Sequence, residues 1–352
     1  MGVLESGLRA LVAASPLWQQ GKTVLAACSG GADSLALTDV MRRQGEIDQV
    51  NVQVVHVQHH LRGDEAEQDA EVVERYCREH GLSFIRKDVE AETFAQEQGF
   101  SLEDAARRLR YEALETARQE TGAVGIFLAH HQDDQAETVL LNLLRGSGTR
   151  GLRGMLPVSG YLARPFLTAT RQDTETYCRE EGLQYCEDSS NDDLSLRRNW
   201  VRKKLLPLLE TQNPRIKKQL AQEAELAAGD EAYLEQKARW YLETFGRDVL
   251  GTQNVRVKEE FNNMPFCIRS RVIRLLVQQA GGGELTYDHV KSILAMLDKG
   301  IGNKSLDVPG NVRLIYWNGE LMAGKKQQSR EEERAAKLAK KEKQRNAGQS
   351  GK

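Results

Sequence analysis

A glycine turn flanked by serines is the first segment whose residue types could do chemistry. The stretch "SGGADS" directly follows an apolar, partly β-branched run, Thr23–Cys28, that is typical of a buried strand, and it leads into leucines at helical spacing. Glycines let a backbone approach its ligand, and free amides and hydroxyls at a helix N-terminus bind phosphate oxygens. The segment therefore predicts a pyrophosphate cradle, in which Asp33 holds the Mg²⁺ of the nucleotide. Its members are Ser29, Gly30, Gly31, Ala32, Asp33 and Ser34.

This turn differs from the two common glycine signatures. No lysine follows its second glycine, as a Walker A motif would require, and its spacing is not G-x-G-x-x-G. An ordinary strand–helix turn, in which Ser or Asp caps the helix, is the competing interpretation. Six specified positions directly after a strand favour the phosphate cradle.

A second polar cluster, "HHQDDQAET", ends another predicted strand with His130 and His131. Asp134 and Glu137 are three residues apart in the following helix and share a face, and Asp133 precedes them. Acids in a first helical turn also complement the helix dipole, but that explanation suits one acid better than three. The cluster predicts an anionic pocket, for an amine or for a divalent metal ion.

Arginines in two further segments could face a phosphate. "RRLRY" places Arg107, Arg108 and Arg110 on a predicted helix, and "RRNWVRKK" places Arg198 and Arg202 four residues apart on one helical face. A guanidinium binds phosphate with a bidentate fork and can stabilise charge that develops on it. A solvated basic face is the simpler interpretation for Lys203 and Lys204.

Two other features keep two interpretations each. His56 ends a predicted strand and is either functional or a packed core residue. The glycine-rich basic segment Arg145–Gly154 either closes over a site and touches RNA phosphates, or is a plain flexible connector.

The elements that must position these residues alternate between strand and helix. Four strands are expected, at Thr23–Cys28, Val50–Gln58, Leu82–Val89 and Ala123–His131. Helices are expected between them, one of them opened by Ser101 with Asp104 three residues later as a capping box. This order predicts an α/β fold with a doubly wound, mostly parallel, Rossmann-like sheet, whose ligands bind beyond the carboxyl ends of the strands.

The alternation ends near Pro214, and charged helical segments follow. We expect a catalytic domain over residues 1–213 and a smaller, mainly helical substrate-binding domain over 214–324 that contains a short hairpin near residues 318 and 319. Residues 325–352 carry ten Lys or Arg against four Glu, while the whole chain has a net charge of −2. This basic tail is expected to be disordered or a frayed helix, although it could also supply phosphate contacts.

Composition excludes several classes of protein. The 352 residues are 40% hydrophobic and 28% charged, without an apolar run of membrane-spanning length or a signal peptide at the N-terminus. The five cysteines are scattered and form no C-x-x-C pair. We expect a cytoplasmic protein in a reducing compartment, without a membrane and without structural zinc.

Together these segments resemble a known group of enzymes. "SGGADS" is similar to the pyrophosphate loop of the N-type ATP pyrophosphatases, or PP-loop family. The rest of the chain, strongly over roughly residues 20–215, resembles the tRNA(Ile)-lysidine synthase family. Five blocks carry that resemblance in the family's order: His56–Glu71, Ser101–Leu114, Ala129–Met155, Arg164–Phe166 and Glu187–Arg202.

The resemblance implies an ATP-dependent ligase. The family attaches the side-chain amine of free L-lysine to the 2-position of the wobble cytidine in tRNA(Ile) with a CAU anticodon. ATP adenylates the cytidine oxygen and releases pyrophosphate, and lysine then displaces AMP to give lysidine. The implied cofactors are ATP and Mg²⁺, and the implied partners are that tRNA and lysine. Whether the chain forms a homodimer is left open.

The resemblance also implies residue roles. It gives catalytic roles to Asp33, His131, Arg110 and Arg202. It makes Asp134 and Glu137 the lysine-binding acids, with Asp133 as a third, and Asp33 the Mg²⁺ ligand through ATP.

Two other functions compete with this one. A tRNA thiolation enzyme could use the same loop, but that chemistry generally needs a cysteine pair or a cysteine-bound cluster. A non-catalytic RNA-binding protein would be expected to lose Asp33, Asp134 or Glu137, and all three are present.

Overall fold

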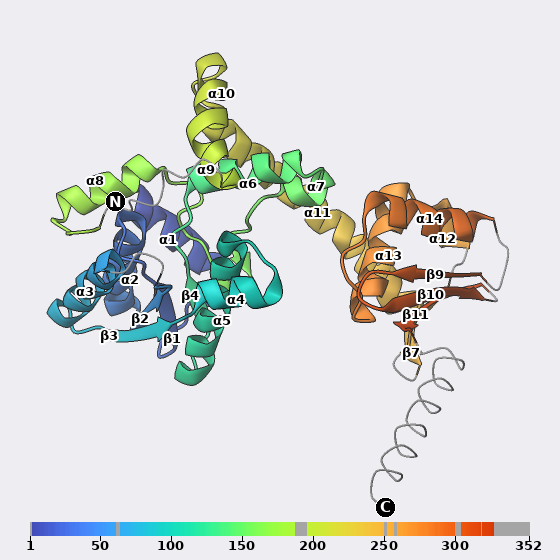
Figure 1. Cartoon of the computed structure of the whole chain (residues 1–352), viewed down its shortest axis with the longest axis horizontal. Coiled ribbons are helices and arrows are strands. Elements are labelled where there is room, and N and C mark those ends of the chain that lie inside the picture. The colour runs from blue at the N-terminus through green and yellow to red at the C-terminus, as the bar shows by residue number, and fades with distance from the viewer. Residues whose placement is uncertain are drawn as a thin grey trace, which may run out of the picture. The chain divides into compact units, whose positions relative to one another are not determined.

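The structure is a computed structural model that describes residues 2–60, 64–186, 196–249, 252–256, 259–299, 304–317 and 319–326. It divides into two compact units, residues 1–229 and 230–352 (Figure 1). The division falls inside helix α11 (Ile216–Phe245), later than the boundary expected at residue 213. The single Gly229 at this division does not interrupt the helix, and the charged helical composition continues on both sides of it, which explains the difference. From residue 327 the expected basic tail lies outside the described residues.

A six-stranded sheet forms the core of the first unit. Its spatial order is β3-β2-β1-β4-β6-β5, and every neighbouring pair is parallel except β5 and β6. The bounds are β1 (Thr23–Ala27), β2 (Asn51–Gln58), β3 (Ser83–Asp88), β4 (Gly125–Phe127), β5 (Val158–Ser159) and β6 (Leu162–Ala163). The expected mostly parallel α/β fold is confirmed. β4 is shorter than expected because its partner β6 pairs only with Ile126 and Phe127.

Helices cover both faces of this sheet (Figure 1). The helices of this part of the chain are α1 (Val3–Ala14), α2 (Ala32–Asp48), α3 (Asp64–Glu79), α4 (Ala91–Gln98), α5 (Leu102–Thr121), α6 (Gln132–Leu144), α7 (Gly148–Leu152) and α8 (Arg171–Glu180), of which α1, α2, α3, α5 and α8 pack on the strands. Because strand side chains alternate, Val24 and Ala26 of β1 pack with α1, α2 and α8, while Leu25 and Ala27 pack with α5. β1 is therefore buried on both sides, which explains its continuous apolar sequence.

A helical segment that begins at Arg197 carries the arginines of interest. It runs through α9 (Arg197–Trp200), the π-helical turn η2 (Val201–Leu205) and α10 (Leu206–Gln212). Val201 and Leu206 pack against Ala136 and Leu140 of α6. This apolar contact holds the arginine-bearing segment against the acid-bearing helix.

Local signals of the sequence position two other segments. Ser101 caps α5, because its hydroxyl accepts a hydrogen bond from the amide of Asp104 at 3.2 Å, as expected. The glycine-rich segment contains α7 and is tied to α6, since Gln135 donates to the carbonyl of Met155 at 2.9 Å and Asn142 donates to that of Gly151 at 2.8 Å. These contacts anchor the C-terminal part of the segment to the helix that carries the acids.

The second unit combines helices with a five-stranded sheet of order β7-β8-β11-β10-β9. Its elements are β7 (Gly246–Val249), β8 (Thr252–Arg256), α12 (Glu259–Asn263), α13 (Phe266–Gln279), α14 (Tyr287–Asp298), β9 (Lys304–Val308), β10 (Val312–Trp317) and β11 (Glu320–Lys325). The expected hairpin is confirmed by the antiparallel pairing of β10 and β11. The sequence did not indicate β7 and β8, because their polar residues lack an apolar alternation. α13 and α14 share one apolar core with the sheet.

None of the helices in the described ranges is both long and apolar enough to cross a membrane. All five cysteines are free thiols, and Cys28, Cys77 and Cys178 are buried.

Candidate active site

The Ser29–Ser34 turn joins β1 to α2 and is closed by its own serines. The hydroxyl of Ser34 accepts a hydrogen bond from the amide of Ser29 at 3.1 Å and donates one to the carbonyl of Gly31 at 3.0 Å. Gly30 has φ +96°, and a Cβ there would lie 3.0 Å from the carbonyl oxygen of Asp69. Both the backbone angle and the closeness of α3 therefore require glycine at this position.

The groups around this turn fit a nucleotide polyphosphate and its cation. Ser29 and Ser34 bring hydroxyls 3.1 Å apart to the N-terminus of a 17-residue helix, whose dipole favours anions. A Cβ at Gly31 would meet Oγ of Ser29 at 3.9 Å and the carbonyl oxygen of Cys186 at 4.0 Å, which are ordinary contacts, so no described atom crowds the backbone at this position. Asp33 provides one carboxylate, and Mg²⁺ in such sites is usually held by one or two carboxylates and the phosphates themselves.

Asp33 is held by two segments that are distant in sequence. Thr174 of α8, which is fully buried, donates a hydrogen bond to Oδ1 of Asp33. Oδ2 of the same carboxylate lies 3.5 Å from Nε2 of His131. The sequence analysis missed Thr174, because nothing in "RQDTETYC" distinguishes it from an ordinary residue on a buried helix face.

His131 connects the turn with the acids of α6. Its Nε2 also lies 3.5 Å from Oδ2 of Asp134, and its backbone amide donates to that oxygen at 3.1 Å, which caps α6. Although burial opposes protonation, the carboxylates of Asp33, Asp134 and Asp133 raise the pKa of His131 above its usual range. The imidazole thus lies between two carboxylates that favour its protonated form.

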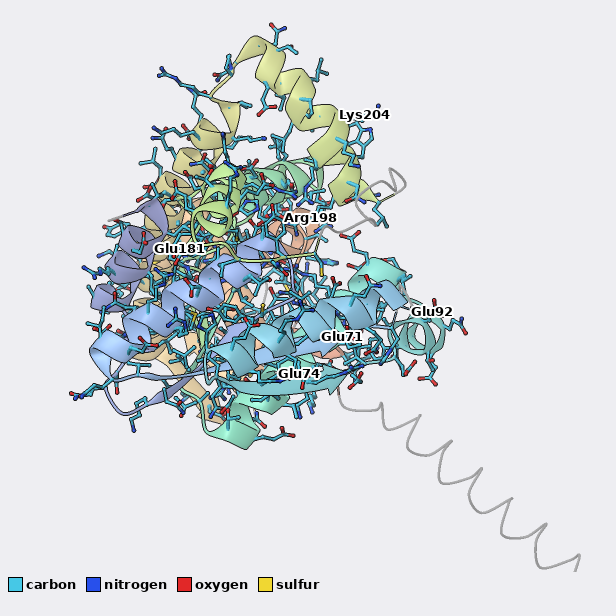
Figure 2. The ribbon with its side chains drawn as sticks, turned by 90° about the vertical axis from the view of Figure 1, so that its left-hand side faces the viewer. Glu71, Glu74, Glu92, Glu181, Arg198 and Lys204 are labelled. Atoms are coloured by element: carbon cyan, nitrogen blue, oxygen red, sulfur yellow. The ribbon has the colours of Figure 1, made fainter. Side chains whose placement is uncertain are left out.

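Two acids and two arginines form a compact cluster beside His131. Glu137, only 1% exposed, accepts from Nε of Arg202 at 2.5 Å and from Nε of Arg198 at 2.8 Å. Arg198 also donates to Oδ1 of Asp134 at 2.9 Å. Figure 2 shows Arg198 closer to the sheet than the exposed Lys204, which lies further along the same helical segment.

Charges around the cluster shift the pKa values of its members. Although burial opposes it, the positive charges of His131 and Arg198 lower the pKa of Asp134 to about 2. Burial lowers the pKa of His130 to about 3, with the charges of Arg110 and Arg198 acting in the same direction. Asp134 is therefore ionised and His130 is neutral at physiological pH.

Two expected site residues lie at the edge of this network. Arg110 is half-buried and has no hydrogen bond or ion pair within the described part of the chain, although it is near Asp134 and Arg198. Asp133 forms an ion pair with Lys217 of α11, whose Nζ lies 2.9 Å from Oδ2 of Asp133 and 3.1 Å from Oε1 of Glu210. No local pattern distinguished Lys217 as a site residue, and it lies beyond the domain boundary expected at residue 213.

His56 of β2 contacts the backbone just before the turn. Its Nδ1 lies 3.0 Å from the carbonyl oxygen of Cys28, and the side chain is buried. Nε2 of His56 is buried without a hydrogen-bond partner, and burial lowers the pKa of the imidazole. Of the two interpretations of His56, this geometry favours the packed core residue.

The alternative of a metal bound by the histidine–aspartate cluster finds no support. Over the residues that the structure describes, no group of three or more His, Cys, Asp or Glu side chains is arranged to hold a metal ion. Arg198 and Arg202, rather than a metal, balance the charge of Asp134 and Glu137.

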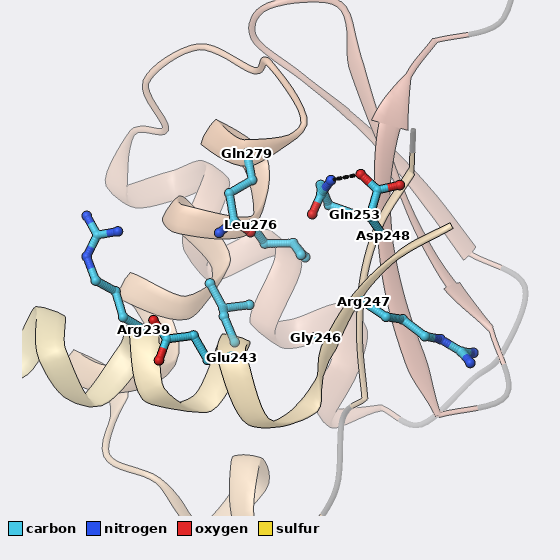
Figure 3. A pocket seen from close by; sticks show the side chains of 9 residues that line it. Arg239, Glu243, Gly246, Arg247, Asp248, Gln253, Leu276 and Gln279 are labelled. Atoms are coloured by element: carbon cyan, nitrogen blue, oxygen red, sulfur yellow. Dashed lines mark hydrogen bonds between the residues drawn. The ribbon is translucent and has the colours of Figure 1, made fainter. Parts of the chain in front are cut away.

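A hollow of about 210 Å³ lies in the second unit, between the end of α11, α13 and the β7–β8 hairpin (Figure 3). Its lining residues are Arg239, Leu242, Glu243, Gly246, Arg247, Asp248, Gln253, Leu276 and Gln279. Two guanidinium and two carboxylate groups give this hollow no preference for an anion or a cation.

Comparison with known proteins places the catalytic unit in a family. The family model described as the PP-loop domain matches residues 4–209. The chain is 36% identical to the tRNA(Ile)-lysidine synthase of Geobacter sulfurreducens over 81% of this chain and 61% of that protein. It is 33% identical to the enzyme of that name from Geobacillus kaustophilus, over 88% of this chain and 68% of the relative. It is 32% identical to the one from Caldanaerobacter subterraneus, over 92% of this chain and 70% of the relative. The chain thus spans between about three-fifths and seven-tenths of the length of these relatives.

A solved structure shares the fold of the first unit. The chain superimposes on a U34-tRNA thiolase from Methanococcus maripaludis with a TM-score of 0.53 at 16% identity, over 64% of this chain and 78% of the other. At this identity the likeness concerns the fold alone.

Proposed function

Since the chain belongs to the tRNA(Ile)-lysidine synthase family of PP-loop proteins, we propose that it ligates free L-lysine to the wobble cytidine of tRNA(Ile) with a CAU anticodon. The observation that carries this proposal is the series of contacts from Asp33 through His131 to Asp134, which shares the partner Arg198 with Glu137. The short separation between the turn and these acids supports a reaction between ATP and an amine, which needs both substrates side by side.

In the first step, the 2-oxygen of the cytidine attacks the α-phosphorus of ATP. The bond from that phosphorus to the bridging oxygen breaks, and pyrophosphate leaves. Ser29, Ser34 and the amides at the N-terminus of α2 would hold the departing pyrophosphate. Asp33 would hold Mg²⁺, which supplies positive charge to the phosphates. Arg110 and Arg202 would stabilise the charge that develops on the α-phosphate.

In the second step, the side-chain amine of lysine attacks C2 of the adenylated cytidine. The C2–O bond breaks, AMP leaves with the oxygen, and the nitrogen loses its extra protons. Asp134 and Glu137 would bind and orient the lysine, with Asp133 as a third acid. His131, which is 3.5 Å from carboxylate oxygens of both Asp33 and Asp134, would keep the two halves of the site in register. ATP, lysine and tRNA meet in the cytoplasm, which is where we place the reaction.

Three of the five cysteines are poorly suited to sulfur transfer. Burial raises the pKa of the Cys28 thiol, which directly precedes the turn, and raises those of Cys77 and Cys178 to about 12. The reactive form of cysteine is the thiolate, which these three residues do not populate near neutral pH.

Incorporation of labelled lysine tests the proposal. The assay uses ATP and either tRNA(Ile) with a CAU anticodon or tRNA(Met), and compares Asp33→Ala with Glu46→Ala, which removes an exposed acid from the same helix. We expect lysine to enter only tRNA(Ile). Asp33→Ala should lose this incorporation, and Glu46→Ala should retain it. Pyrophosphate release without incorporation would overturn the lysine assignment and keep that of the turn, and sulfur transfer would then be assayed.

A further inference from the structure

The acids proposed to bind lysine already have basic partners. Both oxygens of Glu137 accept from guanidinium groups, Oε1 from Arg202 and Oε2 from Arg198. Asp134 accepts from Arg198 through Oδ1 and from the amide of His131 through Oδ2. All four carboxylate oxygens are therefore engaged within the chain itself.

A lysine ammonium can reach Glu137 only if a guanidinium moves aside, because this carboxylate is almost fully buried and both of its oxygens accept from the arginines. Glu137 is 1% exposed, and the side chains of Arg198 and Arg202 are 23% and 29% exposed. Removing one partner of such a buried pair leaves the other charge uncompensated, which is strongly unfavourable. A displaced arginine therefore needs another anion.

The nearest place for that anion is the turn that faces the cluster. His131 contacts both Asp33 and Asp134. Arg202 is close enough to Asp33 that this carboxylate contributes to the raised pKa of Arg202. A polyphosphate seated on the turn would bring several negative charges to the side of the cluster where Arg202 lies, and guanidinium groups bind phosphate in a bidentate manner.

We propose that Arg198 and Arg202 are exchangeable counter-ions that occupy Asp134 and Glu137 until the phosphates of ATP draw them away. This inference rests on the proposed function and adds to it a binding order, ATP before lysine. It also makes Arg198 a specificity-determining residue, because it keeps free amines off the acids until ATP is bound. The energetic consequence is positive coupling between the two ligands, which must be the same in both directions.

Calorimetric titration of the full chain measures this coupling. Lysine is titrated into the protein alone and into the protein saturated with Mg²⁺ and α,β-methylene-ATP, which cannot release pyrophosphate. We expect the analogue to lower the Kd for lysine by about tenfold or more, within the range common for coupled sites. In the reverse titration, lysine should lower the Kd for the analogue by the same factor.

A matched pair of variants identifies the residue responsible. Arg198→Gln removes one counter-ion, and Arg197→Gln removes the exposed neighbouring arginine on the same helix. In Arg198→Gln, lysine should bind without the analogue and the coupling factor should fall toward one, whereas Arg197→Gln should match the unmodified chain. A purely structural ion pair would lower the melting temperature of Arg198→Gln and leave the coupling factor unchanged.

The unmodified chain decides the outcome even if Arg198→Gln does not fold. Equal Kd values for lysine with and without the analogue would overturn the proposal. A second result would also overturn it: a chain that incorporates lysine into tRNA(Ile) but binds no lysine in either titration. In that case lysine binding would depend on the adenylated tRNA and not on ATP. A chain that incorporates no lysine at all would instead fail the test of the proposed function.

Discussion

Thr174 donates a hydrogen bond to Oδ1 of Asp33, although 141 positions separate the two residues in the chain. One helical turn further along α8, Tyr177 donates to Oδ2 of Asp39 at 2.7 Å. Two adjacent turns of α8 are thus tied to α2. The hydrogen bond from Tyr177 to Asp39 helps to hold α8 against α2. The hydrogen bond from Thr174 then orients the carboxylate of Asp33 beside the nucleotide turn.

Thr174→Val keeps the shape of this buried side chain and removes its hydroxyl. The Asp33 carboxylate then faces a methyl group and loses a donor, and hydrogen bonds to charged groups are worth about 1.5–3 kcal/mol. We expect Mg²⁺-dependent binding of α,β-methylene-ATP to weaken by about tenfold, measured by titration calorimetry. Thr174→Ser should restore it, and Thr176→Val on the same helix should leave it unchanged. Unaltered binding by Thr174→Val would show that the hydroxyl does not position Asp33.

Gly30→Ala should damage both stability and nucleotide binding. Its φ of +96° strains any other residue, and the added Cβ would press on the carbonyl of Asp69 at 3.0 Å. Gly81→Ala is the control, because Gly81 also has a positive φ, of +66°, but open space around it. We expect a loss of about 1–2 kcal/mol in the free energy of unfolding for Gly81→Ala and a larger one for Gly30→Ala. Only Gly30→Ala should weaken binding of the ATP analogue. A Gly30→Ala variant that binds the analogue as tightly as the unmodified chain would contradict this prediction.

His130 should make the protein less stable in mild acid. Its pKa is lowered to about 3 in the folded chain by burial, against about 6.5 in the unfolded chain, so the unfolded state takes up the proton first. Neutral His130 makes its full contribution to the free energy of unfolding above pH 6.5. That contribution is lost as the pH falls toward 3, at up to about 1.4 kcal/mol per pH unit. His130→Gln should flatten the fall in unfolding free energy between pH 6.5 and 5, measured by denaturant titration. The exposed His80, changed to Gln, should leave that slope as it is.

The second unit contains a buried ion pair of its own. Glu231, 3% exposed, accepts from Nε of Arg271 at 3.1 Å, and Arg271 also donates to the carbonyl of Cys267 at 2.6 Å. Glu231→Gln leaves the guanidinium without its counter-ion and should cost about 3–5 kcal/mol in unfolding free energy. Glu235→Gln, which breaks a pair with the exposed Arg239, should cost less than about 1 kcal/mol. Equal effects in denaturant titrations would show that burial of Glu231 does not govern the pair.

Local patterns in the sequence were sufficient for much of the architecture. The apolar run of β1, the Ser101 cap of α5 and the alternation of strands with helices depend on neighbouring residues, so they predicted the parallel sheet and the turn at its edge. The five-stranded sheet of the second unit was missed because β7 and β8 lack an apolar alternation. The division between the units was placed too early because α11 runs through it without a break.

The sequence by itself determined which chemical groups are present, namely the serines and Asp33 of the turn, the acids that open α6 and the arginines near residue 200. Only the tertiary structure decided how they pair. Arg198 and Arg202 were expected beside a phosphate, but in the folded chain they lie on Glu137, more than 60 positions away. Thr174 reaches Asp33 only because α8 packs on α2. The physical reason is that helical periodicity predicts which face a side chain lies on, whereas the partner of that face depends on how distant elements pack.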